Sequence, residues 1–380
     1  MDEPGPGRVT QLRLADFRNY TTLRIDIDSR FVVLAGDNGA GKTNFIEAVS
    51  LLTPGRGLRR ATYGEMARVA GSGGFSVRAG LARPNDEPAD VLTLMQPQAG
   101  VGPHRQVRID AVAARSADEL LDLCRILWLT PSMDGLFTGP AAERRRFLDR
   151  LVLTLHPEHG RRSTDFEKAM RGRNRLLAED RGDDAWLSGI EVQMAELGLA
   201  IALARAETVH RLAAAIHTGP AADGTFPLAG LQLDPGYGAL DFSRAGVDVE
   251  DEIAARLRRS RGLDRAAGRT LEGPHRADLV VTHLAKSMPA GLASTGEQKA
   301  LLIGLVLAHA DLVRQSCGVP PILLLDEIAA HLDPGRRAAL FDILDRLGVQ
   351  SFMTGTDRAL FDALEGRAQI LAATNGSLAP

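Results

Sequence analysis

The stretch that decides the fold is Gly36-Asp37-Asn38-Gly39-Ala40-Gly41-Lys42-Thr43, which matches G-x-x-x-x-G-K-[ST] at every fixed position. An apolar run at 31–35 precedes it and predicts a buried strand, and the residues after it predict a helix. In such a loop the backbone N–H groups and the helix N-terminus face phosphates, Lys42 reaches the β- and γ-phosphates, and Thr43 ligates Mg²⁺. We therefore expect residues 36–44, ending with Asn44, to hold ATP. The alternative is an ordinary glycine-rich turn before a helix.

A second motif is acidic. Residues 321–326 read Pro-Ile-Leu-Leu-Leu-Asp, which predicts a buried strand that ends at Asp326, and Glu327 follows directly. In a phosphate-loop fold an Asp at this place completes the Mg²⁺ shell, and the next Glu orients or deprotonates the attacking water. We assign Asp326 to the metal, and Glu327 with Lys42 to catalysis. Read alone, the motif is also typical of a solvated strand end.

A third motif reads Ser294-Thr295-Gly296-Glu297-Gln298-Lys299 and precedes an apolar helix. Ser294 lies 32 positions before Asp326. Hydrogen-bond donors at a helix N-terminus favour anions, so Ser294, Gly296 and Glu297 are candidates for a second phosphate site. The same string is also an ordinary helix start, in which Ser caps the helix and Glu completes a capping box.

The composition excludes several classes of protein. Hydrophobic residues make up 44% and charged residues 24% of the 380 residues, as in a folded globular protein. The 45 Lys and Arg against 48 Asp and Glu give a net charge of -3, so nucleic acid would need a local patch. Two cysteines exclude a disulfide framework and indicate a cytoplasmic protein. No apolar run approaches the length of a membrane span, so we expect no membrane partner.

The pattern of the sequence changes along its length. Short apolar runs separated by turn residues predict a sheet-building region before about residue 113, and long helical patterns begin near residue 139. Residues 218–238 predict a loop, and residues 181–184 a turn within a helical hairpin. One apolar stripe predicts a buried helix face, formed by Trp186, Ile190, Met194, Leu197 and Ile201.

Taken together, the motif order resembles the ATP-binding-cassette (ABC) head of the structural-maintenance (SMC) type, an α/β fold with a short helical second lobe. The resemblance rests on the phosphate loop, the serine signature, the acidic motif and the following Ala330-His331-Leu332-Asp333. It implies that the signature completes the ATP site of a second copy, and we count Asp333 among the nucleotide-binding residues. We expect head segments at 1–128 and 266–380 around a helical lobe at 129–265.

Finer motifs resemble one family, the bacterial recombination and replication-repair ATPase RecF. They are Leu14-Ala15-Asp16-Phe17-Arg18-Asn19-Tyr20, Thr130-Pro131-Ser132, the segment 139–149, Glu272-Gly273-Pro274-His275-Arg276-Ala277-Asp278-Leu279, and Thr354-Gly355-Thr356-Asp357. Thr354 stands where transporter cassettes place a histidine near the γ-phosphate, so we count it among the nucleotide contacts. Because threonine carries no charge, a charged phosphate sensor is not expected there.

Arginines form two candidate DNA patches, since guanidinium groups suit phosphate contacts. The first, just beyond the predicted ATP helix, consists of Arg56, Arg59 and Arg60. The second, in the helical middle, is headed by Arg144, Arg145 and Arg146. The alternative is a solvated helix face paired with nearby acids.

The family resemblance implies a weak ATPase that dimerises on ATP, clamps duplex DNA near gaps or single- to double-strand junctions, and is released by slow hydrolysis. It also implies RecR- and RecO-type mediator partners and support of recombinase loading. One alternative is a P-loop kinase or other phosphoryl transferase, which has no use for a signature helix. Another is an SMC-like structural chromosome protein, which would need hundreds of coiled-coil residues between the motifs.

Overall fold

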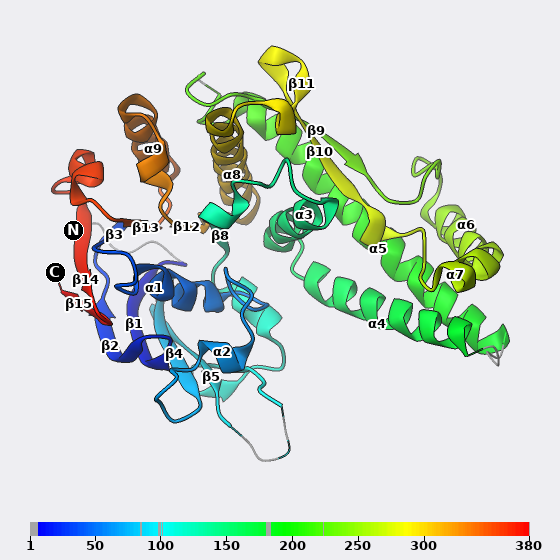
Figure 1. Ribbon diagram of the computed structural model, residues 1–380, viewed down its shortest axis with the longest axis horizontal. Helices are drawn as coiled ribbons and strands as arrows, with labels where there is room; N and C mark the ends of the chain where they lie inside the picture. Colours follow the sequence, from blue (N-terminus) through cyan, green and yellow to red (C-terminus); the bar gives the residue numbers. More distant parts are fainter. Residues whose placement is uncertain are drawn as a thin grey trace. The chain divides into compact units, whose positions relative to one another are not determined.

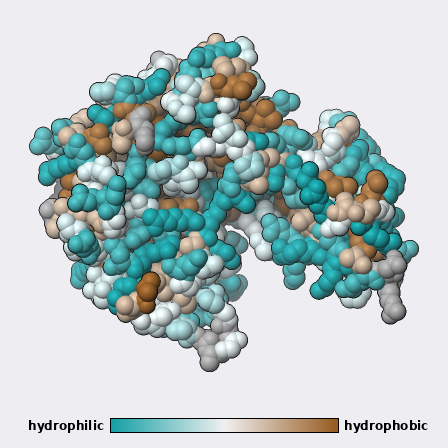
Figure 2. Space-filling view, in the orientation of Figure 1, coloured by the Kyte–Doolittle hydropathy of each residue, from teal (hydrophilic) through white to brown (hydrophobic). Residues whose placement is uncertain are grey.

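The computed structural model describes residues 7–83, 86–97, 100, 102–179, 184–222 and 224–379. It divides into two compact units (Figure 1). Unit 1 comprises residues 1–134, 215–228 and 294–380, and unit 2 comprises residues 135–214 and 229–293. Unit 2 therefore starts and ends later in the sequence than the helical lobe predicted at 129–265. Residues 215–228, between its two segments, belong to unit 1. Figure 2 shows hydrophilic residues over most of the visible face.

A mostly parallel sheet, called the parallel sheet below, forms the centre of unit 1. Its strand order is β15-β14-β3-β13-β12-β8, and only the edge strand β15 runs antiparallel to its neighbour. Its central strands are almost entirely apolar because both faces are covered. The strands are β3 (Phe31–Ala35), β8 (Ile126–Leu129), β12 (Ile322–Leu325), β13 (Ser351–Gly355), β14 (Ala368–Thr374) and β15 (Ser377–Ala379).

A second sheet of unit 1, the antiparallel sheet, has the order β2-β1-β4-β5-β6-β7. Helix α1 (Lys42–Val49) contributes Phe45, Ile46 and Val49 to one apolar core together with the inner faces of both sheets. The helix that follows the phosphate loop is thus held from two sides. The strands are β1 (Val9–Phe17), β2 (Tyr20–Asp26), β4 (Phe75–Arg83), β5 (Asp86–Met95), β6 (Gln106–Ile109) and β7 (Val112–Ala113).

The helices α8 (Thr295–Cys317) and α9 (Pro334–Leu347) lie on the face of the parallel sheet opposite α1 (Figure 1). The helices α8 and α5 (Asp184–Thr218) are each long and apolar enough to cross a membrane, although no apolar run of that length was expected from the sequence. The most apolar window of α8 is 78% buried and that of α5 is 50% buried. Burial of this kind is what a core helix of a folded protein shows. The short helix α2 (Tyr63–Met66) also belongs to unit 1.

Unit 2 combines helices with a small antiparallel sheet of order β11-β10-β9. The loop predicted at 218–238 is wrong in part, because β9 (Ala229–Asp234) pairs with β10 along its whole length. That pairing partner lies more than forty residues away in the sequence, where local pattern carries no signal. The remaining elements are β10 (Asp278–His283), β11 (Met288–Pro289), α3 (Ala141–Leu155), α4 (His159–Ala178), α6 (Gly246–Arg259) and α7 (Arg261–Ala267).

The predicted apolar stripe of α5 is confirmed for four of its five residues and wrong for Trp186. Met194 and Ile201 are buried, and Ile190 and Leu197 pack against the same core. Trp186 is 65% exposed, whereas Leu187 beside it in the same turn is 2% exposed, so in the first turn of α5 the buried face passes through Leu187 and not through Trp186. The turn predicted at 181–184 falls almost wholly outside the described residues.

Asp149 of α3 ties three helices of unit 2 together. Its Oδ1 lies 2.8 Å from Nε2 of His159, and Arg205 of α5 donates to both carboxylate oxygens at 2.8 and 3.0 Å. Burial raises the pKa of Asp149, but the hydrogen bonds and charges of His159 and Arg205 outweigh it and lower the pKa from 3.8 to about 2.

This depressed pKa predicts an acid-sensitive contribution to stability. Because the folded pKa lies below the unfolded value, Asp149 stabilises the protein above about pH 4, and the contribution is lost as the pH falls from 3.8 towards 2. We expect the free energy of unfolding of Asp149→Asn to fall less steeply with pH in this window than that of the wild type. Urea unfolding at pH values above and within the window measures this, and equal slopes would contradict it.

Candidate functional site

The carboxyl ends of three neighbouring parallel strands bring the predicted motifs together. Strand β13 lies between β3 and β12, with Thr354 opposite Leu34 and Met353 opposite Leu325. The phosphate loop follows β3, and Asp326 follows β12, so both leave the sheet at the same edge. Ligand sites of parallel α/β sheets form at this edge.

The phosphate loop curls around its own lysine. The Nζ of Lys42 donates to the carbonyl oxygens of Gly36 at 2.5 Å and Asp37 at 2.8 Å, and the side chain is only 4% exposed. Gly41 precedes α1 with φ 112°, and among the described residues no side chain caps the start of this helix. A phosphate group suits this arrangement, because its oxygens accept hydrogen bonds from both the Lys42 ammonium and the backbone N–H groups.

The turn between β1 and β2 supports the loop, which sequence reasoning missed. The hydroxyl of Tyr20 donates to the carbonyl of Gly41 at 3.0 Å, and Asn19 Nδ2 donates to that of Ala40 at 3.3 Å. Asn44 in turn donates to Asn19 Oδ1 at 2.8 Å, and burial raises the pKa of Tyr20. Asn19 and Tyr20 belong to the N-terminal motif at 14–20, but the sequence of that motif does not show which carbonyl groups their side chains reach.

We expect Gly41→Ala to destabilise the protein by about 3 kcal/mol, the sum of a left-handed backbone and overpacking. A Cβ at Gly41 would lie 2.6 Å from Asn19 Nδ2 and 3.0 Å from the Tyr20 hydroxyl. Gly39→Ala is the matched control, because Gly39 also has positive φ (83°) but a Cβ there meets nothing within 4 Å. Urea unfolding without nucleotide compares them, and equal losses would contradict the clash.

Thr43 and Asp326 form a fitting pair of ligands for Mg²⁺. The hydroxyl of Thr43 donates to Asp326 Oδ1 at 3.0 Å. This contact places the Thr43 hydroxyl beside the Asp326 carboxylate, so one Mg²⁺ could take the hydroxyl oxygen and the second carboxylate oxygen, Oδ2, as ligands. Both donors are oxygens, as this cation prefers. In the described part of the chain no cluster of three or more His, Cys, Asp or Glu residues offers a rival metal site.

Glu327 follows Asp326 in an unusual backbone conformation, with φ 55° and ψ 18°. Its N–H donates to the hydroxyl of Thr354 at 2.9 Å, and that hydroxyl donates to Asp326 Oδ1 at 2.7 Å. Thr354 is 1% exposed. Its hydroxyl is therefore turned toward the acidic motif, whereas the sequence predicted a contact with nucleotide.

Ser294 and Asp333 both begin helices. The Ser294 hydroxyl accepts from the N–H of Glu297, and the Glu297 carboxylate accepts from the N–H of Ser294, which forms the capping box that was the alternative interpretation. Ser294 and Gly296 are nevertheless exposed, and a Cβ at Gly296 would meet nothing within 4 Å. Asp333 caps α9 by accepting from the N–H of Arg336. The start of α8 is thus capped by residues of its own chain, and its Ser294 and Gly296 are still accessible from outside.

The second arginine patch is largely occupied by contacts within unit 2. Arg144 donates twice to Asp278 at 2.8 Å, Arg145 donates to the carbonyl of Ala277, and Arg146 pairs with Glu143. A guanidinium in a two-pronged ion pair is not available to a phosphate without breaking that pair.

The first arginine patch is exposed at all three positions, Arg56, Arg59 and Arg60. Arg59 donates to Asn44 Oδ1 at 2.6 Å and to the buried Glu47 at 3.2 Å, so it connects the patch to the helix that follows the phosphate loop. Glu47 also binds Arg18. This buried carboxylate was not identified from the sequence.

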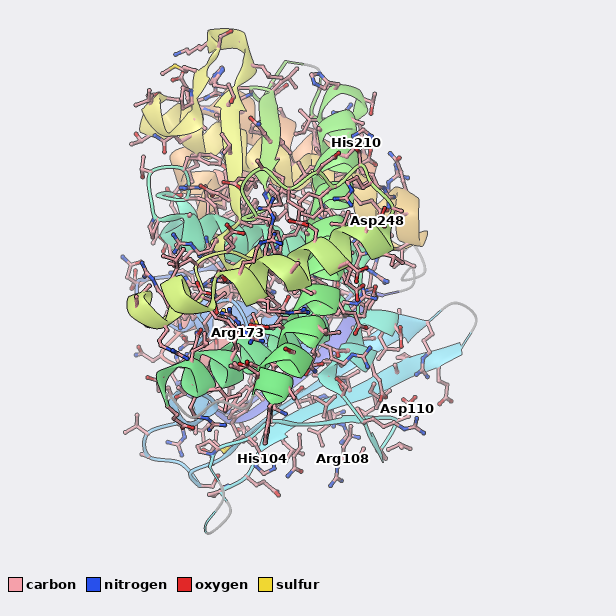
Figure 3. The ribbon with its side chains drawn as sticks, turned by 90° about the vertical axis from the view of Figure 1, so that its right-hand side faces the viewer. His104, Arg108, Asp110, Arg173, His210 and Asp248 are labelled. Carbon is pink, nitrogen blue, oxygen red and sulfur yellow. The ribbon has the colours of Figure 1, made fainter. Side chains whose placement is uncertain are left out.

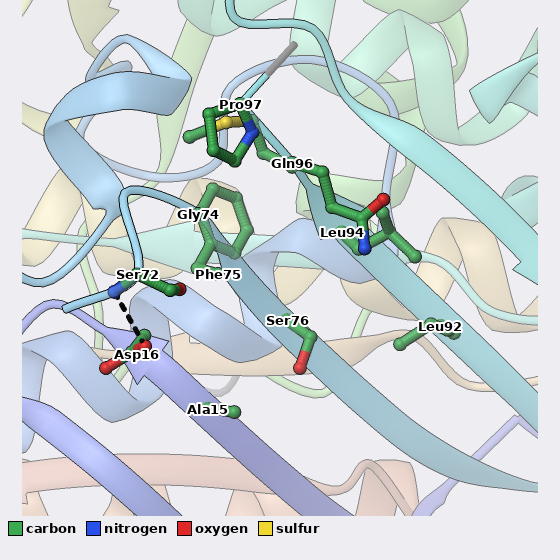
Figure 4. Close-up of a pocket in the computed structure, with 11 residues that line it drawn as sticks. Ala15, Asp16, Ser72, Gly74, Phe75, Ser76, Leu92, Leu94, Gln96 and Pro97 are labelled. Carbon is green, nitrogen blue, oxygen red and sulfur yellow. Dashed lines mark hydrogen bonds between the residues drawn. The ribbon is translucent and has the colours of Figure 1, made fainter.

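A cavity of about 570 Å³ lies on strands β1, β4 and β5 (Figure 4), and none of its lining residues is a predicted site residue. Its acidic member, Asp16, already accepts hydrogen bonds from Arg68 at 2.8 Å and from the N–H of Ser72 at 3.0 Å. These bonds lower the pKa of Asp16 to about 2. Two of the acceptor sites of this carboxylate are therefore taken by the protein itself.

Comparison with known proteins agrees with the motifs. The RecF/RecN/SMC N terminal domain family model matches residues 8–378. The DNA replication and repair protein RecF of Mesorhizobium japonicum is 56% identical over 377 residues, which cover 99% of both chains. The protein of the same name from Rhizobium meliloti is 58% identical over 373 residues, which cover 97% of both.

Solved structures share the fold. The structure of the recombination mediator protein RecF-ATPrS in the RecFOR pathway has a TM-score of 0.84 at 20% identity, covering 98% of this chain and 97% of that one. An Smc head domain from Pyrococcus furiosus has a TM-score of 0.52 at 15% identity, covering 97% and 94%. The predicted fold class, an SMC-like ABC-type head, is confirmed. With the family model and the close relatives together, the chain belongs to the RecF family.

Proposed function

We propose that this chain is an ATP-dependent DNA-binding ATPase of DNA replication and recombinational repair. The observation that carries the proposal is the convergence of Lys42, Thr43, Asp326 and Glu327 at one edge of the parallel sheet. The relatives named as DNA replication and repair proteins, and the RecF structures named for ATP or an ATP analogue, support it.

In the proposed mechanism the loop N–H groups and the start of α1 bind the phosphates, and Lys42 exchanges its two carbonyl partners for phosphate oxygens. Thr43 and Asp326 hold Mg²⁺, which when bound neutralises charge on the phosphates. Glu327, partly exposed beside them, orients the attacking water and accepts its proton. The chain thus supplies the binding groups and the base from separate strands of one sheet.

The proposed second half of the site comes from another copy of this chain. Ser294 and Gly296 are exposed at the N-terminus of a 23-residue helix, where a phosphate is favoured by the helix dipole. Asp333 is exposed at a second helix start. ATP would then join two copies, and hydrolysis would separate them.

For DNA, the patch Arg56, Arg59 and Arg60 is the better-supported contact, because all three are exposed, whereas Arg144 and Arg145 are half-buried and hold Asp278 and the Ala277 carbonyl. Phosphate contacts of this kind do not read base sequence, so the preference would be for a DNA shape. We include in the proposal binding near gaps and single- to double-strand junctions, RecR- and RecO-type partners, slow turnover in support of recombinase loading, and a cytoplasmic location.

Gly296→Gln tests the proposal. The variant should place a side chain between two copies without disturbing either monomer, because a Cβ at Gly296 meets nothing. Light scattering of the Glu327→Gln protein with ATP should give twice the monomer mass, with the mass of the DNA in addition when duplex DNA is present, and the added Gly296→Gln should restore the monomer. Gly246→Gln, at the exposed start of α6, is the matched control. A Glu327→Gln protein that stays monomeric and indifferent to DNA would overturn the clamp, and full activity of Gly296→Gln would favour a phosphoryl transferase.

A further inference from the structure

One buried hydroxyl connects the two acidic residues of the candidate site. Thr354 Oγ1 donates to Asp326 Oδ1 at 2.7 Å and accepts from the Glu327 N–H at 2.9 Å. The side chain is 1% exposed, and Asp326 is 5% exposed. A hydroxyl is the one small group that donates and accepts at once, so this contact needs serine or threonine.

The fold explains why this residue reaches both groups. Strand β13 lies between the strand that leads into the phosphate loop and the strand that leads into Asp326. Thr354 stands one position beyond the last paired residue of β12, since Leu325 is opposite Met353. The last side chain of the middle strand therefore faces the first turn that follows β12.

The backbone of Glu327 needs such support. Its φ of 55° is costly for a residue with a Cβ, and it persists only where surrounding contacts determine it. The hydrogen bond from Glu327 N–H to Thr354 is one such contact, and it fixes the direction in which the Glu327 side chain leaves the chain.

The hydrogen bonds also fix the orientation of the Asp326 carboxylate. Thr43 and Thr354 both donate to Oδ1, and in the described part of the chain no hydrogen bond to Oδ2 is present. Two donors on one oxygen fix the rotamer and leave the other oxygen for a metal ligand. Partners of this kind commonly orient ligating carboxylates.

We propose that Thr354 is a positioning residue that sets Asp326 for the metal and Glu327 for the water, and that it does not itself contact the nucleotide. The inference rests on the proposed function, since it concerns the same site. It replaces the expectation that Thr354 binds the phosphates. In this role Thr354 needs no charge of its own, because the charged groups of the site are the carboxylates of Asp326 and Glu327, which it orients.

Thr354→Val tests this inference, because valine keeps the shape of threonine and lacks the hydroxyl. Without nucleotide, amide hydrogen exchange in a peptide spanning Asp326 and Glu327 should become faster. Binding of Mn²⁺ in the presence of ATP, measured by electron paramagnetic resonance, should weaken about tenfold or more, as expected for a lost hydrogen bond to a charged group. Binding of ATP in the presence of a chelator should not change. Thr354→Ser should restore all three measurements.

The outcomes separate this inference from the proposed function. If Thr354→Val weakens ATP binding in chelator and leaves Mn²⁺ binding and exchange unchanged, Thr354 contacts the nucleotide and the inference is wrong. If Thr354→Ser behaves like Thr354→Val, shape and not the hydroxyl matters, and the inference is also wrong. If the wild type binds neither ATP nor Mn²⁺ with ATP, the proposed function itself fails. Thermal unfolding of both variants identifies any general loss of folding.

Discussion

Glu327→Gln is expected to lower ATP turnover by about 10²- to 10⁴-fold, the usual contribution of a positioned general base. Glutamine has nearly the same shape as glutamate but accepts no proton at neutral pH. The contact that holds the backbone here uses the main-chain N–H of Glu327 and the hydroxyl of Thr354, so the substitution leaves it intact. Phosphate release at saturating ATP measures the effect.

Binding should survive this substitution. The groups proposed to hold the nucleotide are Lys42 and Thr43 with the loop backbone, and none of them bonds to the Glu327 side chain among the contacts described. Isothermal titration with ATP should therefore give a Kd close to that of the wild type. Glu365→Gln, at an exposed position outside the site, is the matched control. Unchanged turnover in Glu327→Gln would assign the base to another residue.

The sequence was sufficient for the motifs because each lies within one short segment. The phosphate loop needs a strand, glycines and a helix in direct succession, and residues 31–49 contain all three. The acidic motif likewise ends a four-residue apolar strand, Ile322–Leu325. Their meeting at one sheet edge could be expected from the resemblance, since parallel strands share a carboxyl edge.

What could not be predicted depends on contacts between distant segments. The hydroxyl of Thr354 reaches Asp326 across 28 positions, and that of Tyr20 reaches the Gly41 carbonyl across 21. Both side chains are polar residues at strand ends, which by pattern alone suit either a ligand or a structural bond. Arg144 looked available in a basic run, but its partner Asp278 is 134 positions away.

The largest effect on stability is expected from Arg173→Met, at about 3–5 kcal/mol, the usual cost of removing one partner of a buried ion pair. Arg173 (labelled in Figure 3) is fully buried and lies in α4. It donates to Glu191 at 3.0 Å and to Asp264 at 2.7 Å, and these acids are 0% and 1% exposed. Chemical denaturation measures the loss.

A nearby exposed arginine serves as the control for this substitution. Arg171 of the same helix pairs with Glu167 at 3.5 Å, and both side chains are more than half exposed. Arg171→Met should therefore cost at most about 0.5 kcal/mol, the range of exposed pairs four residues apart on a helix. Equal losses for the two methionine variants would show that helix propensity, and not the buried charge, sets the effect.

A second substitution separates the unpaired charge from the lost packing. Glu191 keeps Arg261 as a partner at 2.6 Å when Arg173 is removed, whereas among the described residues the Asp264 carboxylate keeps the Ser260 hydroxyl and the Leu271 N–H. Asp264→Asn should therefore destabilise the wild type but stabilise the Arg173→Met protein, since it removes a buried carboxylate that has lost its cation. A change of the same sign in both backgrounds would mean that Arg173 acts through packing alone. Whether Asp264→Asn stabilises or destabilises the Arg173→Met protein thus tests whether charge holds these helices of unit 2 together.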